Sequence, residues 1–95
     1  MIATVWNNGS LGWGIRISLK NRGTFFSKEN AKITIGIDEA TYFFELKPSF
    51  WKNCPEIRGK EIKTWIMKNG LKAGDKVRLE VIDPSEKFQL LCNIV

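Results

Sequence analysis

Two short segments of this chain combine side chains that are suited to recognising nucleic acid. Residues 7–14 read Asn-Asn-Gly-Ser-Leu-Gly-Trp-Gly, and residues 47–55 read Lys-Pro-Ser-Phe-Trp-Lys-Asn-Cys-Pro. An Asn side chain offers a paired donor and acceptor that suits the adenine edge in the major groove, while Arg and Lys reach guanine or phosphate. Glycines let backbone N–H groups approach phosphates closely. The two segments are therefore candidate recognition loops.

The same residues also have a simpler structural interpretation. Asn-Asn-Gly-Ser is ordinary turn chemistry, and Trp13 and Trp51 belong to a residue type that more often packs against a core than stacks on bases. Asn53 is the best single candidate for recognition, because Lys52 and Asn53 form a polar gap between two aromatic residues and a proline. Both interpretations stay open at this point.

Charge is distributed unevenly along the 95 residues, which carry a net charge of +5. Residues 1–37 hold five basic residues and one acidic residue, and residues 47–78 hold nine basic and three acidic residues. Residues 38–46 hold three acids and no base. Positive charge confined to two segments is expected of a face that binds a polyanion. Solubilising lysines on a small surface explain it equally well.

An enzymatic alternative rests on Asp38, Glu45 and Lys47. They mimic the Asp…Glu-x-Lys pattern of metal-dependent nucleases, in which two acids hold magnesium and the lysine polarises the scissile phosphate. Such residues are common at hairpin ends, so we expect no catalytic site, metal or cofactor. The sequence has no histidine, which excludes histidine-dependent acid–base chemistry and serine triads. A β-barrel that binds a protein or a small ligand, with incidental basic charge, is the third alternative.

The spacing of apolar residues predicts a mainly β fold. Alternation predicts strands at residues 2–6, 15–19, 32–37, 41–46, 77–82 and 88–94, with residues 7–14 as an exposed loop. A short helix is expected around residues 21–26. Six short strands with turn signals at this spacing predict a sheet curled into a barrel. Trp6 is interpreted as a packing residue.

Residues 60–69 predict the longer of the two helices. Ile62, Trp65 and Ile66 have i, i+3, i+4 spacing and therefore share one face, with Trp65 as a packing residue. The pair Asn69-Gly70 is a stop signal, because glycine readily adopts the left-handed conformation that ends a helix. The pattern is typical of a helix half-sunk against a sheet.

The second half of the chain resembles the B3 DNA-binding domain, the pseudobarrel of plant transcription factors and of recognition domains in some bacterial restriction endonucleases. The matching residues are Phe50-Trp51-Lys52-Asn53-Cys54, Trp65-Ile66, Asn69, Leu71, Gly74 and Asp75. The expected order of strand, long loop, strand, short helix, hairpin, loop, helix and hairpin is also similar, over about residues 4–91. The resemblance implies a single domain over residues 1–95, folded as an open β-barrel of the pseudobarrel type.

The resemblance also implies sequence-preferring binding of double-stranded DNA. In the B3 family two loops, the N-arm and the C-arm, grip the major groove, and residues 7–16 and 51–54 correspond to them. The candidate DNA-binding residues are Asn7, Asn8, Ser10, Trp13, Arg16, Lys20, Arg22, Trp51, Lys52, Asn53 and Cys54. In a restriction system the implied partner is a nuclease domain or subunit.

The remaining expectations concern compartment and thiols. No apolar run approaches membrane-spanning length, and the N-terminus lacks the apolar region of a signal peptide. We therefore expect no membrane association and a cytoplasmic protein in a bacterium, or a nuclear one in a eukaryote. Cys54 and Cys92 are too few for a disulfide framework or a metal site. Both are expected to be free thiols, with Cys92 in the core.

Overall fold

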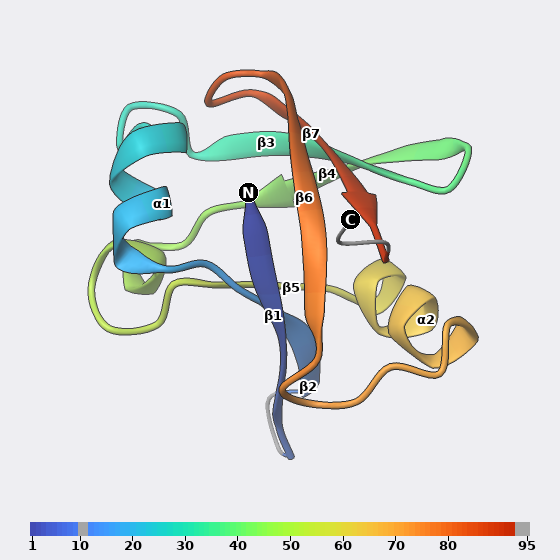
Figure 1. Ribbon diagram of the computed structural model, residues 1–95. Helices are drawn as coiled ribbons and strands as arrows, with labels where there is room; N and C mark the ends of the chain where they lie inside the picture. Colours follow the sequence, from blue (N-terminus) through green and yellow to red (C-terminus); the bar gives the residue numbers. More distant parts are fainter. Residues whose placement is uncertain (10–11, 93–95) are drawn as a thin grey trace.

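The computed structural model describes residues 1–9 and 12–92 and shows a mainly β fold in that part of the chain (Figure 1). Two α-helices and one 3-10 helix interrupt the strands. In chain order the elements are β1 (Ile2–Asn8), β2 (Gly12–Arg16), α1 (Leu19–Phe25), β3 (Lys32–Ile37), β4 (Ala40–Glu45), η1 (Pro48–Trp51), β5 (Glu56–Arg58), α2 (Lys60–Lys68), β6 (Lys76–Asp83) and β7 (Lys87–Leu91). The predicted mainly β class is confirmed.

The strands form one sheet in the order β4-β3-β7-β6-β1-β2-β5. Neighbouring strands are antiparallel except β3 and β7, which are parallel. Strands β4 and β5 lie at the two edges and do not pair with each other in the described residues, so the sheet is not closed into a barrel. The two edges make contact through side-chain packing instead of strand pairing, since the Phe44 ring of β4 lies against Gly59, directly after β5.

The core lies on one face of the curved sheet. Among the described residues, no polar or charged residue is buried as a whole. Ala3 and Val5 of β1 point inward, as do Val77 and Leu79 of β6, and the residues between them are not buried. This alternation is what a strand with one solvated face requires. We call the face that carries the core the inward face of the sheet, and the opposite face the outer face.

Helix α2 confirms the predicted helix and its end signal. Ile62, Trp65 and Ile66 are its buried residues. Gly70 has φ of 63°, and the N–H of Leu71 donates to the carbonyl of Ile66 at 3.0 Å, as expected of a glycine-terminated helix. Neither this helix nor α1 has the length and apolar character needed to span a bilayer.

Helix α1 begins earlier than expected and shortens the preceding strand. The predicted strand over residues 15–19 ends at Arg16, because the Ser18 hydroxyl accepts a hydrogen bond from the Asn21 N–H at 3.1 Å and caps the helix. After the helix, the Phe26 ring stacks on Phe88 with centroids 4.9 Å apart. Phe26 also lies 5.3 Å from Phe50. This aromatic cluster joins α1, β7 and η1.

Within the predicted exposed loop, residues 7–8 and 12–14 belong to strands, which corrects our expectation. Strand β1 continues to Asn8 and β2 starts at Gly12, with Asn7 opposite Trp13 and Asn8 opposite Gly12. Cross-strand pairing satisfies backbone groups that an open loop would leave to water, and Gly12, with φ of 93°, accepts the conformation that this requires. The strand pairing therefore continues almost to the tip of the hairpin.

Two further expectations need correction. Strand β5 was not predicted, since its three residues are too few to show a periodic pattern and it forms by pairing with β2. Cys92 was expected in the core but is exposed. The predicted strand over residues 88–94 ends at Leu91, so the alternation that would turn Cys92 inward stops one residue before it.

Candidate nucleic-acid interface

The first predicted segment lies at the tip of the β1–β2 hairpin. Asn7 and Asn8 are exposed there, near the end of β1. Trp13 is half-buried and packs against the core, which agrees with its packing interpretation. Ser10 lies outside the described residues. Among the described residues of this tip, Asn7 and Asn8 present exposed amide side chains.

The second predicted segment is a compact loop anchored by one aromatic residue. Phe50 of η1 is buried, and Trp51 meets its ring edge-on at 5.2 Å while packing against the core. The N–H groups of Lys52 and Cys54 both donate to the carbonyl of Ser49 at 3.1 Å. These contacts fold the loop on itself and leave the side chains at its tip, Lys52, Asn53 and Cys54, exposed.

Helix α1 holds this loop in place through Arg22. Its Nη1 donates to the carbonyl oxygens of Phe50 and Lys52, each at 3.0 Å. The Arg22 guanidinium carbon also lies 5.8 Å from the centroid of Trp51, and Lys28 Nζ lies 5.9 Å from the same ring. Arg22 is thus occupied in ordering the loop. By contrast, Lys20 on the same helix is exposed.

Strands β2 and β5 connect the two segments. Ile17, just beyond β2, donates its N–H to the carbonyl of Pro55 at 2.8 Å, so the last residue of the second segment lies beside the end of β2. The hairpin tip lies at the opposite end of β2. At about 3.4 Å per residue, the five residues of β2 separate the segments by roughly 14 Å. The predicted residues therefore form two groups at the ends of one strand pair.

The outer face of β1, β2 and β5 lies between these groups. It carries Arg16, which we predicted as a binding residue, Arg58, which we did not predict, and Trp6, which we wrongly expected to pack in the core. Trp6, Gly14 and Arg58 occupy one row across the three strands, and Thr4, Arg16 and Glu56 occupy the next. We call this surface the outer β1–β2–β5 face. Strict alternation in β1 would have revealed Trp6, because it is out of phase with the inward Ala3 and Val5. No comparable signal identifies Arg58, since its neighbours arrive from distant strands.

The outer β1–β2–β5 face presents positive charge. Arg16 and Arg58 lie on it, and its acid, Glu56, has a side chain only 4% exposed. Glu56 Oε2 lies 3.8 Å from Arg16 Nε and has no hydrogen-bond partner among the described residues. Arg16 is therefore exposed and Arg58 half-buried, whereas the carboxylate is covered.

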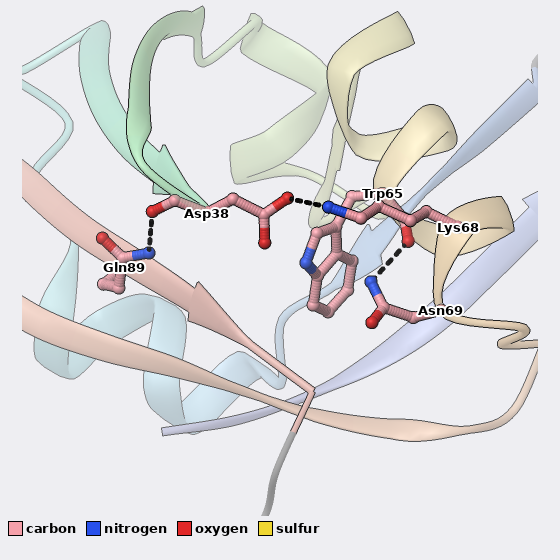
Figure 2. A network of polar contacts seen from close by, with 5 residues as sticks. All are labelled: Asp38, Trp65, Lys68, Asn69 and Gln89. Carbon is pink, nitrogen blue, oxygen red and sulfur yellow. Dashed lines mark hydrogen bonds and ion pairs between the residues drawn. The ribbon is translucent and has the colours of Figure 1, made fainter.

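The residues of the nuclease-like pattern do not come together. Asp38 lies in the β3–β4 turn, whereas Glu45 is the last residue of β4, at the far end of the hairpin. Asp38 Oδ2 pairs instead with Lys68 Nζ of α2 at 3.0 Å, and its carbonyl accepts from Gln89 at 3.5 Å (Figure 2). No group of three metal-ligating side chains is present in residues 1–9 and 12–92.

Comparison of the chain with protein-family models, with curated proteins and with solved structures found no match.

Proposed function

We propose that the chain binds double-stranded DNA with a preference for certain sequences, through the outer β1–β2–β5 face and the polar segment at each end of it. The proposal extends the resemblance to the B3 family. It is supported by the observed element order, in which a strand pair, a helix, a hairpin, a loop with a short strand, a second helix and a final hairpin follow one another. In this proposal the open curved sheet is a B3-like pseudobarrel.

The observation that carries the proposal is the charge between the two segments. Arg16 and Arg58 lie on the outer face, and the only acid in their two rows is almost fully covered. A duplex carries a dense row of phosphates, and basic side chains that neutralise them supply most of the non-specific affinity. A face with one exposed and one half-buried arginine and a covered acid meets that requirement.

The spacing of the two segments also supports the proposal. They are separated by roughly 14 Å along β2, and the major groove is about 12 Å wide. One segment offers Asn7 and Asn8, and the other offers Lys52 and Asn53. Amides are suited to base edges and the lysine to phosphate. Both segments can therefore engage one groove from its two sides.

Order in the second segment favours recognition over non-specific attraction. Arg22 fixes two carbonyl groups of the loop, and buried Phe50 anchors it. A loop that is already ordered loses less conformational entropy on binding. Asn53 is thus carried on a fixed support. In this proposal any cleavage chemistry belongs to a separate nuclease domain or subunit.

The test is a salt titration of duplex binding. If ~4–6 phosphates are neutralised, log K falls against log salt with a slope of about −4 to −5. The variant Lys20→Gln/Lys52→Gln should bind more weakly, and its slope should be shallower by about two units. The matched control, Lys32→Gln/Lys87→Gln, removes the same charge from the outer face of β3 and β7 and should leave the slope nearly unchanged.

A wild type that does not bind duplex at low salt, or binds it with no salt dependence, would end the DNA proposal. Equal losses for the two double variants would place the binding surface elsewhere on the protein.

A further inference from the structure

Trp6 and Arg58 meet on the outer β1–β2–β5 face because the residue between them has no side chain. Trp6 is opposite Gly14 on β2, and Gly14 is opposite Arg58 on β5. The guanidinium carbon of Arg58 lies 5.6 Å from the centroid of the Trp6 ring. A Cβ on Gly14 would lie 2.8 Å from Arg58 Cγ. The absence of that atom lets the two side chains approach each other across a whole strand.

This contact restrains Arg58 without using its hydrogen-bond donors. A guanidinium over an indole is held by the ring quadrupole, while its five N–H groups remain available to an acceptor. Arg58 makes no ion pair with any carboxylate in residues 1–9 and 12–92. Arg58 therefore combines a restrained side chain with unused donors.

The other cations near this face each lie close to a polar partner. Arg16 lies 3.8 Å from Glu56, and Arg78 lies 3.6 Å from Glu80. Lys76 donates to the hydroxyl of Thr4 at 2.8 Å. Arg58 differs from them in having its charge restrained by an aromatic ring and no polar partner among the described residues.

A restrained guanidinium with a free fork of donors is suited to a planar pair of acceptors. Guanine presents such a pair, O6 and N7, in the major groove, and Arg contacts both at once. A phosphate also accepts from the Arg fork, but a lysine can bind phosphate as a point charge, so a phosphate contact does not require the orientation that Trp6 gives Arg58. The Trp6 contact thus favours base reading.

We propose that Arg58, positioned by Trp6 across Gly14, reads a guanine in the DNA target, so that the preferred site contains at least one essential G·C pair. This inference rests on the proposed duplex binding. It assigns sequence specificity to the outer β1–β2–β5 face, which lies between the two segments. Arg58 is the reading residue, and Trp6 acts through it.

The experiment begins with selection on randomised duplexes, using the wild type and Arg58→Lys. The wild-type consensus should contain a guanine that Arg58→Lys no longer requires. Replacing that guanine with 7-deazaguanine, which lacks the N7 acceptor, should weaken wild-type binding about tenfold and Arg58→Lys binding by less than twofold. Arg78→Lys, a control on β6 whose guanidinium is paired with Glu80, should keep the wild-type consensus.

Trp6→Leu separates positioning from charge. It leaves the net charge unchanged, so the salt slope should stay at the wild-type value while discrimination at the essential guanine falls about threefold to tenfold. A loss of stability alone would lower the active fraction without changing the ratio between two DNA sequences.

Three results would overturn the inference. An unchanged consensus for Arg58→Lys would remove Arg58 from base reading. Equal weakening on every duplex by Arg58→Ala would make it a phosphate contact, with the proposed function intact. A wild type that binds no duplex would reject both proposals.

Discussion

Gly14 and Gly36 form a matched pair for measuring how much the sheet tolerates an added methyl group. Both are buried, both lie in strands that are paired on each side, and neither has positive φ. A Cβ on Gly14 would lie 2.5 Å from the backbone oxygen of Ile57. On Gly36 the new atom would first meet Oε1 of Gln89. One obstacle belongs to a strand, and the other is the end of a flexible side chain.

The two substitutions should therefore differ in their effect on the free energy of unfolding. Gly14→Ala forces β2 and β5 apart by about half an ångström, and overpacking of this kind costs about 1–3 kcal/mol. Replacing glycine in a strand returns about 0.5–1 kcal/mol, so a net loss of roughly 0.5–2 kcal/mol is expected. For Gly36→Ala the Gln89 side chain rotates away, and the change should stay within about 0.5 kcal/mol of zero.

Urea unfolding followed by tryptophan fluorescence measures both values. A difference of ~1 kcal/mol corresponds to roughly 4–8 °C in the melting temperature of a domain of this size, so a thermal scan provides a second measurement. Equal losses for the two variants, or a larger loss for Gly36→Ala, would refute the reasoning. Such a result would show that β2 and β5 move apart at as little cost in free energy as the end of the Gln89 side chain.

Three other outcomes are expected. Asn53→Ala should cost ~1–3 kcal/mol on the preferred duplex and little on random DNA, whereas Lys52→Ala should weaken both alike and reduce the salt slope by about one unit; an unchanged consensus for Asn53→Ala would exclude it from base reading. Arg22→Met removes two hydrogen bonds to loop carbonyls, so it should lower the unfolding free energy by about 1–3 kcal/mol and speed amide exchange in residues 47–55. The control Lys20→Met should change neither quantity. Unchanged, slow exchange in Arg22→Met would contradict the role of Arg22 in ordering the loop. Both cysteine thiols are exposed and should react with a thiol reagent in the native protein, and protection of either until unfolding would contradict its placement.

Elements with a strong local pattern were predictable from the sequence. The spacing of Ile62, Trp65 and Ile66 and the Asn69-Gly70 stop signal placed α2 to within one residue of its observed end. Alternation placed β3 at its observed bounds and β4 to within one residue. These signals work because helices and half-buried strands repeat every 3.6 and every two residues, so apolar spacing reports them directly.

The candidate site was predictable only in its parts. The exposure of the amides of Asn7, Asn8 and Asn53 and of the Lys52 side chain follows from turn chemistry and polarity. That Arg22 orders the second loop does not follow, because its acceptors are carbonyl groups about thirty residues away in the chain. Backbone carbonyls occur at every position, so no residue type marks the ones that a fold will bring to a guanidinium.

What the sequence determined by itself was six of the seven strands in outline, the two helices and the basic character of the chain. The tertiary structure alone decided which of those residues share a face. Trp6 and Arg58 are fifty-two residues apart in the chain and meet because β2 pairs with β1 on one side and with β5 on the other, with Gly14 between them. Pairing register is set by the competition of all strands for one core. A contact between outer-face residues is a consequence of that register and has no local signature in the sequence.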